Sequence, residues 1–335
     1  MPSINQKVIV PLLRNTFFVA ILMGCVVWVF SSSFSTNSNK VQPIEFTDTL
    51  GIQVALGKRL FYEKLMSRDS SLSCGSCHKQ ELAFTDGLPQ SKGFKGQIVA
   101  RNSPTLTNVK DQKFLLRDGV NPSLEAQVLV PIQEHDEFDF HILLIAERLK
   151  KDSTYVAMSK NAFGRLPDPY VITHSIAAFE RTFVSKNAPY DWFVGGDSSA
   201  FNQITKRGYD LFFNELYCGK CHNGPNLTNQ SFTNNGLYKT YADSGRMRLT
   251  EKENDRAVFK VPTLRNVGVT FPYMHNGSLK SLDEVIEHYK QGGHGHKNQS
   301  SLIVPFELNE EDKKCLIAFL NSLTDSDFIN NPAYR

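Results

Sequence analysis

Two short strings of the chain each combine a pair of cysteines with a histidine: Cys74-Gly-Ser-Cys77-His78 and Cys218-Gly-Lys-Cys221-His222. In a C-x-x-C-H string, the two thiols add to the vinyl groups of one porphyrin and the histidine becomes an axial ligand of its iron. The doubled string therefore predicts two covalently bound c-type haems. A cysteine pair can also form a redox dithiol, and two pairs can bind one zinc ion. Neither alternative explains why a histidine follows each pair.

The composition fits a protein that encloses apolar cofactors. The chain has 335 residues, 41% of them hydrophobic and 24 of them phenylalanine, which is enough for sizeable cores. The formal net charge of +3 is too balanced to suggest nucleic acid binding. Four of the six cysteines belong to the two strings, so no disulfide framework remains. Cys315 lies in a helical pattern and is expected to be a small buried hydrophobic residue.

The N-terminal 40 residues form a separate segment. Lys7 and Arg14 precede an apolar run over residues 16–30, and a polar spacer follows. This pattern predicts an export signal that is either cleaved or retained as a membrane anchor. The string that ends at Cys25 resembles a lipoprotein cleavage box, but the apolar residues after it favour an anchor or an ordinary signal peptide. The rest of the chain is expected in the periplasm, tethered to the inner membrane if the segment is retained.

The remainder of the chain is predicted to be mainly α-helical. Each C-x-x-C-H string follows a helical pattern, which suggests two cytochrome c-like haem domains with long loops. We expect helices from Asp48 to about Lys64, over 172–185, over 204–217, from a capping box at Ser281 through Tyr289, and a last helix capped by Asn309. Long loops are expected over 84–123, 223–247 and 291–305. The predicted domains are 1–40 (signal or anchor and spacer), 41–195 (N-terminal haem domain) and 196–335 (C-terminal haem domain).

The flanks of both strings resemble the bacterial di-haem cytochrome c peroxidase family, which includes the methylamine-utilisation protein MauG. The resemblance covers about residues 45 to 325. It implies that the first haem reacts with peroxide, that the second haem transfers electrons, and that one Ca²⁺ lies between them. The matching strings are Leu56-Gly-Lys-Arg-Leu-Phe61, Ala83-Phe-Thr-Asp-Gly87, Arg101-Asn-Ser-Pro-Thr105, Ala178-Phe-Glu-Arg-Thr182, Arg207-Gly-Tyr-Asp-Leu-Phe212, Lys260-Val-Pro-Thr-Leu-Arg-Asn266 and Pro272-Tyr-Met-His-Asn-Gly277.

The resemblance also implies a peroxide site. Gln127, Pro131 and Glu137 match the residues that line the family's peroxide pocket. A carboxyl group near an apolar haem face is expected to have a raised pKa, which suits proton transfer. Glu134 and His135 are the nearest competitors of Glu137, since a run of acidic residues is also typical of a solvated loop.

Phe94 stands where peroxidases of this family often carry a histidine that blocks the first iron. Because phenylalanine cannot bind iron, the first haem is expected to be open on that face.

The second haem has two candidate axial ligands besides His222. Tyr289 stands where the peroxidases carry a methionine and MauG carries a tyrosine, so the resemblance implies ligation by Tyr289. Met274 is the competitor, although it falls at another position of its motif. A phenolate is a hard anionic ligand that lowers the reduction potential, whereas a thioether raises it.

Two further positions concern the region between the haems. Arg117 replaces the tryptophan that commonly bridges the haems in the family, and arginine cannot be oxidised as an electron relay. The calcium ligands implied by the resemblance are the side chain of Asn102 and the backbone carbonyls of Thr270 and Pro272.

The sequence therefore predicts a di-haem peroxidase that reduces hydrogen peroxide to water with electrons from a small cytochrome or cupredoxin. The alternative is a MauG-like enzyme that oxidises side chains of a protein substrate. A third hypothesis, an electron carrier with two saturated haems, conflicts with an open first haem. The sequence leaves the electron donor and a homodimeric state open.

Overall fold

The computed structural model describes residues 49–335. About 47% of the described residues are helical, which confirms the expected mainly α fold. The predicted signal or anchor and the expected cap Asp48 lie outside the described residues. Within residues 49–335, no helix has both the length and the apolar character needed to cross a bilayer.

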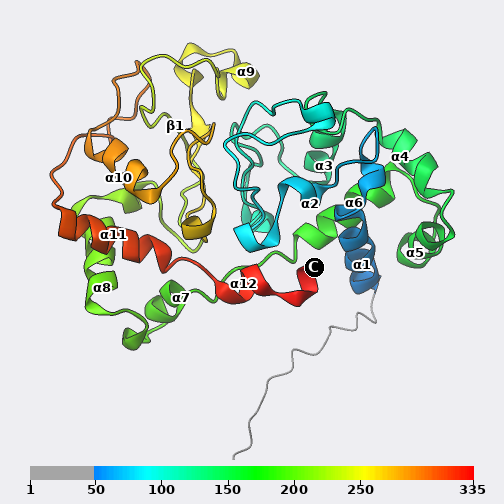
Figure 1. Cartoon of the computed structure of the whole chain (residues 1–335), viewed down its shortest axis with the longest axis horizontal. Coiled ribbons are helices and arrows are strands. Elements are labelled where there is room, and N and C mark those ends of the chain that lie inside the picture. The colour runs from blue at the N-terminus through cyan, green and yellow to red at the C-terminus, as the bar shows by residue number, and fades with distance from the viewer. Residues whose placement is uncertain (1–48) are drawn as a thin grey trace, which may run out of the picture. The chain divides into compact units, whose positions relative to one another are not determined.

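Twelve α-helices and two short strands are connected by irregular segments and single helical turns in the described part of the chain (Figure 1). Strands β1 and β2 pair in antiparallel fashion, with Phe232 opposite Lys260. The elements are α1 (Thr49–Phe61), α2 (Cys74–Cys77), α3 (Leu124–Gln133), α4 (Ile142–Leu149), α5 (Ser153–Phe163), α6 (Pro169–Glu180), α7 (Pro189–Val194), α8 (Gln203–Asp210), β1 (Phe232–Thr233), α9 (Met247–Thr250), β2 (Phe259–Lys260), α10 (Leu282–Lys290), α11 (Glu310–Asn321) and α12 (Ser326–Asn330).

The helix ends follow local capping chemistry. The side chain of Ser281 accepts a hydrogen bond from the backbone of Glu284, and Asn309 accepts one from Asp312, so both expected N-caps are confirmed. The helix expected over 172–185 is α6, which begins three residues earlier at Pro169 because Asp168 caps it. The expectation that Asn309 caps the last helix was wrong, since α12 follows α11.

Two apolar clusters form the core. The first joins α1, α3, α4, α5 and α6, and the second joins α7, α8, α10 and α11. In each cluster, one glycine lets two helices pack closely. A Cβ at Gly57 would lie 1.8 Å from the Ser175 carbonyl oxygen, and one at Gly208 would lie 1.9 Å from that of Cys315. The helix pairs α1–α6 and α8–α11 therefore each cross where a glycine of one helix contacts the backbone of the other.

The same correspondence extends to the two C-x-x-C-H strings. A Cβ at Gly75 would lie 2.4 Å from the ring of Tyr62, and one at Gly219 would lie 2.6 Å from the ring of Phe213. In each half, an aromatic residue just beyond the glycine-containing helical segment thus contacts the haem-attachment string. This local repeat agrees with two related halves, while the division into domains 41–195 and 196–335 stays a prediction.

The C-terminal residues return to the first cluster. Phe328 of α12 and Tyr334 pack among the aromatic side chains around Phe84. The side-chain amide of Gln80 donates to the carbonyl of Phe328 at 3.1 Å, and the hydroxyl of Tyr62 donates to that of Tyr334 at 2.7 Å. The chain end therefore supports the segment that carries the first attachment string.

Candidate functional site

One cavity of about 1320 Å³ is lined by all four cysteines and both histidines of the two attachment strings. It extends between the two apolar clusters, and residues from α3, α6, α10, α11 and the long irregular segments line it. The cysteines and histidines on its wall are Cys74, Cys77, His78, Cys218, Cys221 and His222. The sequence placed these residues in two separate strings, and the fold brings both strings to one space.

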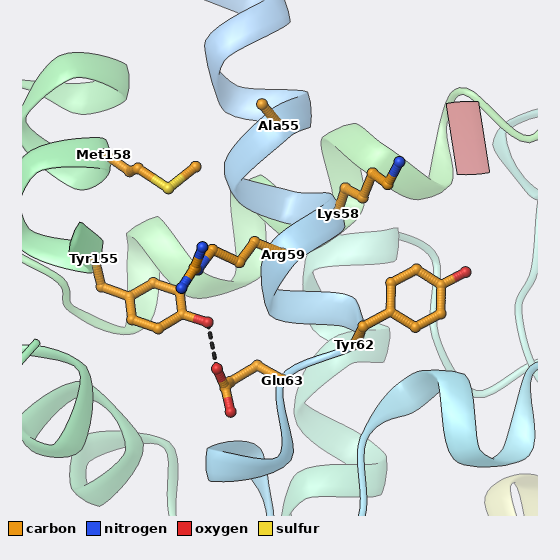
Figure 2. A pocket seen from close by; sticks show the side chains of 7 residues that line it. All are labelled: Ala55, Lys58, Arg59, Tyr62, Glu63, Tyr155 and Met158. Carbon is orange, nitrogen blue, oxygen red and sulfur yellow. Dashed lines mark hydrogen bonds between the residues drawn. The ribbon is translucent and has the colours of Figure 1, made fainter. Parts of the chain in front are cut away.

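A second, more open hollow of about 470 Å³ lies beside α1 (Figure 2). The hydroxyl of Tyr155 donates to Glu63 there, and the guanidinium of Arg59 lies 5.0 Å from the centre of the Tyr155 ring. Lys58 donates to the carbonyl of Ala333 at 2.9 Å. Because these polar groups already have partners within the protein, we place no site in this hollow.

The first attachment string is held in a geometry that suits iron ligation. Nδ1 of His78 lies 2.7 Å from the carbonyl oxygen of Phe84. Since a carbonyl only accepts, Nδ1 carries the proton and Nε2 keeps its lone pair for a metal. Ser103 supports the same turn by donating its hydroxyl to the carbonyl of Cys77 at 3.1 Å.

The second string repeats this arrangement. Nδ1 of His222 lies 3.3 Å from the carbonyl oxygen of Leu227. Burial lowers the pKa of His222 to about 4, and burial also lowers the pKa of His78. Both imidazoles are therefore neutral at pH 7, which is the protonation state that binds iron.

The thiols fit haem attachment better than the alternatives. Burial raises the pKa of all four string cysteines, to about 11 for Cys77 and about 12 for Cys218. A redox dithiol needs the opposite shift, whereas a thioether carries no ionisable proton. Within the described part of the chain, no group of three or more His, Cys, Asp or Glu side chains is assembled to hold a metal ion. The structure thus does not assemble the four-cysteine zinc site.

Helix α3 and the segment after it form the wall beside the first string. Gln127 and Pro131 lie one turn apart on α3, and both line the cavity. The chain then folds back, because the backbone of Phe138 donates to the carbonyl of Pro131 and that of Phe140 donates to the carbonyl of Ile132. This reversal brings Glu137 to the cavity wall.

Glu137 has the electrostatics expected of a proton-transfer group. Burial, together with the smaller effect of the neighbouring carboxylates Asp136 and Glu134, raises its pKa to about 7. The charge of Glu137 in turn raises the pKa of both Cys74 and Cys77, so its carboxyl interacts with the first attachment string. Its competitor Glu134 also lines the cavity but is exposed, and His135 is exposed as well.

The loop around Phe94 is packed against the segment that carries Glu137. The backbone of Phe94 donates to the carbonyl of Glu137 at 2.7 Å. A Cβ at Gly93 would lie 1.8 Å from the carbonyl oxygen of Asp136, so only glycine allows this approach. Phe94 itself is buried, and its side chain is not part of the cavity wall.

Glu180 is a wall residue that the sequence reasoning missed as a functional candidate. It ends α6, lines the cavity and is 8% exposed, and its Oε2 atom has no hydrogen-bond partner. Burial raises its pKa to about 8. The available signal was a glutamate directly after the apolar run that ends at Phe179.

Tyr289 lies on α10 and lines the cavity near the second string. Burial raises its pKa, and the charges of Cys218 and Cys221 raise it further, while the side chain of Asn235 lowers it. The competitor Met274 also lines the cavity, but its sulfur accepts a hydrogen bond of 3.2 Å from Asn235. His288 is not on the wall, because its Nε2 contacts the carbonyl oxygen of Asn235 at 3.1 Å.

Arg117 and the residues expected to bind calcium all lie on the cavity wall. Asn102, Thr270 and Pro272 all line it, as does Arg117. The guanidinium of Arg117 donates from Nε to the backbone oxygen of Asn102 at 3.0 Å and from Nη2 to its side-chain oxygen. The two oxygens of Asn102 are thus hydrogen-bonded to an arginine, and its side-chain nitrogen donates to the carbonyl of Leu88.

These features define a class of protein: a c-type cytochrome with two haem-attachment strings on one cavity and a titratable carboxyl beside the first. Comparison with known proteins then identifies the family. The sequence model of the di-haem cytochrome c peroxidases matches residues 52–199. The methylamine utilization protein MauG of Methylorubrum extorquens is 38% identical over 276 residues, which cover 81% of this chain and 78% of that protein.

Two further comparisons agree. The cytochrome c551 peroxidase of Nitrosomonas europaea is 31% identical and covers 93% of this chain and 92% of its own length. The crystal structure of a MauG-like protein associated with microbial copper homeostasis superimposes with a TM-score of 0.81 at 32% identity, covering 85% of this chain and 92% of that one. The chain belongs to the di-haem cytochrome c peroxidase family. Membership implies an oxidoreductase with two c-type haems.

Proposed function

We propose that the protein reduces hydrogen peroxide to water at its first haem, with two electrons from a small redox protein that enter through the second haem. One peroxide, two electrons and two protons give two waters. When bound, the first haem supplies an iron position at which the oxygen–oxygen bond is cleaved. The observation that carries this proposal is the carboxyl of Glu137, whose pKa is about 7, on the wall beside the first attachment string.

In this proposal, Glu137 is the group that moves the proton. Its carboxylate accepts a proton from the peroxide oxygen nearer the iron and returns it to the far oxygen, which leaves as water. A pKa near 7 suits both transfers, because the group is then a moderate base and a moderate acid at neutral pH.

The other wall residues of α3 position the peroxide in this proposal. The Oε1 atom of Gln127 accepts a hydrogen bond of 2.9 Å from Asn121, which orients the amide and leaves its Nε2 free to donate to a bound oxygen. Pro131 offers no N–H and presents an apolar face one turn further along α3.

Tyr289 is proposed as the second axial ligand of the second haem, opposite His222. A buried phenol without a charge partner resists ionisation, so a ferric iron is the cation that would stabilise the phenolate. Met274 is the weaker candidate, because Asn235 already donates to its sulfur.

A MauG-like oxidation of a protein substrate is the second candidate function. The tyrosine at position 289 and the absence of a histidine at position 94 favour it, as does the 38% identity with a protein named MauG. Arg117 weakens it, because this branch relies on electron exchange between the haems and arginine cannot serve as a redox relay.

We place this function in the periplasm, where c-type haems are attached, with a small cytochrome or cupredoxin as the donor. Tethering by the N-terminal segment and a homodimeric state remain part of the proposal. The calcium ion expected from the family resemblance is not part of this proposal, because Arg117 contacts its expected ligand Asn102.

The test uses the haem-loaded protein in its ferric state. Electron paramagnetic resonance should show one high-spin haem, open to peroxide, and one low-spin haem. Tyr289→Phe should change the low-spin signal, whereas the matched variant Met274→Leu should leave it unchanged. Each molecule of hydrogen peroxide should then oxidise two molecules of a reduced small cytochrome. Two low-spin haems that do not react with peroxide would exclude both enzymatic functions.

A further inference from the structure

Among the cations on the cavity wall that have no carboxylate partner, Lys220 is exposed, whereas Arg117 and Lys260 are only partly exposed. Arg117 and Lys260 both line the cavity, and neither forms an ion pair with any described residue. The ammonium of Lys260 donates to the side-chain oxygen of Gln112 and, at 2.8 Å, to the carbonyl oxygen of Phe114, which are both neutral acceptors. A buried charge without a counter-charge is costly, so these two positions call for an explanation.

The fold holds Arg117 at its position from several sides. Its own carbonyl accepts a hydrogen bond of 2.7 Å from the backbone of Lys260 in β2. Leu116 and Gly119 on either side have positive φ angles of 61° and 75°, which form the tight turn that carries it. A Cβ at Gly119 would lie 2.3 Å from the ring of Phe232, so β1 closes the other side of this turn.

The nearby acidic residues are already paired with other arginines. Asp118 accepts from Arg101 at 2.6 Å and also from Arg248. Asp243 pairs with the same Arg101. None of these carboxylates contacts Arg117, although Asp118 is its neighbour in sequence. The positive charge of Arg117 is therefore directed to another group, the two oxygens of Asn102.

This contact conflicts with the calcium site expected from the family resemblance. Calcium binds oxygen atoms at about 2.3–2.6 Å and would need the side-chain oxygen of Asn102. The guanidinium of Arg117 already donates to that oxygen and to the backbone oxygen of the same residue. A dication beside a fixed guanidinium would also be repelled. Arg117 and Lys260 together carry two positive charges, which is the charge of one calcium ion.

We propose that the guanidinium of Arg117, supported by the ammonium of Lys260, replaces the calcium ion of the family as the fixed positive charge between the two haems. The protein then loads both haems and functions without calcium. The haem propionates are the carboxylates that these two cations would hold. This inference rests on the proposed di-haem enzyme, and it adds that the cation between the haems is part of the polypeptide.

The experiment measures calcium in the haem-loaded protein, without any activity assay. The protein is treated with the chelator EGTA and desalted, its two haems are counted by mass, and its calcium content is determined by elemental analysis. Fewer than about 0.1 calcium ions per chain, and no heat or spectral change when calcium chloride is added, are expected. About one tightly held calcium ion per chain would overturn the proposal.

The variant Arg117→Gln removes the cation and frees the oxygens of Asn102. It is expected to bind about one calcium ion per chain, seen as a saturable heat of binding. The matched control is Arg256→Gln, which removes an exposed arginine paired with Glu253 and should stay calcium-free. A haem-loaded Arg117→Gln protein that binds no calcium would also overturn the replacement.

If Arg117→Gln yields no haem-loaded protein, the wild-type calcium content decides alone. Because haem count and calcium content are read without peroxide or donor, a failure of the proposed peroxidase activity leaves this answer intact.

Discussion

Replacing Glu137 by glutamine tests the proton-transfer step directly. The variant keeps the shape of the side chain but cannot accept a proton from peroxide. General base catalysis contributes roughly 100- to 10,000-fold, so the second-order rate constant for peroxide should fall by that factor, or by about 3 to 5 kcal/mol of barrier. Both haems should stay attached, since Glu137 is not part of either C-x-x-C-H string.

The pH dependence adds a second readout. With the pKa of Glu137 at about 7, the wild-type rate constant should increase about tenfold for each unit of increasing pH up to about pH 7, and it should be constant at higher pH. This limb should disappear in Glu137→Gln. Stopped-flow mixing with excess peroxide between pH 5 and 9 measures it.

The matched control is Glu134→Gln, which changes the neighbouring carboxylate. Because Glu134 raises the pKa of Glu137, its removal should move the midpoint of the pH profile to a lower pH while the plateau rate is retained. Equal losses in both variants, or an unchanged rate in Glu137→Gln, would refute the assignment of Glu137.

Stability separates lost chemistry from lost folding. The folded pKa of Glu137 lies above its ordinary value of 4.5, so the free-energy cost of burying it is absent below pH 4.5 and grows until about pH 7. That cost reaches about 3 kcal/mol, since one pKa unit is about 1.4 kcal/mol. Glu137→Gln removes it and should melt no lower than the wild type at pH 8.

Two further variants test the wall around this site. In Gly93→Ala the new Cβ meets the carbonyl oxygen of Asp136, so the free energy of unfolding should fall by about 1–3 kcal/mol and the peroxide rate constant should fall with it. The control is Gly96→Asn, where the new side chain meets open space. Equal melting temperatures for the two variants would contradict the close approach at Gly93. Because the folded pKa of Glu180 is about 8, the wild type should lose about 3 kcal/mol of stability relative to Glu180→Gln as the pH rises from 5.5 to 9, measured by thermal melts. If the melting temperatures of the two proteins depend on pH in the same way, Glu180 is not a buried carboxyl.

The chemistry that the sequence predicted was local chemistry. A C-x-x-C-H string carries two thiols and an imidazole within five residues, so haem attachment can be inferred without knowledge of the fold. The caps at Ser281 and Asn309 were predictable for the same reason, because a cap depends on a side chain and a backbone N–H three residues away. The mainly α class followed from helical periodicity.

Long-range packing decided what the sequence left open or missed. The pKa of Glu137 and the burial of Glu180 depend on how much water the surrounding chain removes, which no local pattern reports. The return of α12 to the first apolar cluster follows from contacts with residues more than 240 positions earlier, such as Gln80.

Arg117 shows the difference most clearly. Its sequence position, where the family has a tryptophan, indicated only that an electron relay is missing. The tertiary structure shows that its guanidinium donates hydrogen bonds to the two oxygens of Asn102. Asp118, its neighbour in sequence, pairs instead with Arg101 and Arg248. The sequence alone predicts which groups attach the haems, because covalent chemistry depends on adjacent residues. Only the folded chain decided which charges face each other, because electrostatic pairing and desolvation depend on distance in space rather than along the chain.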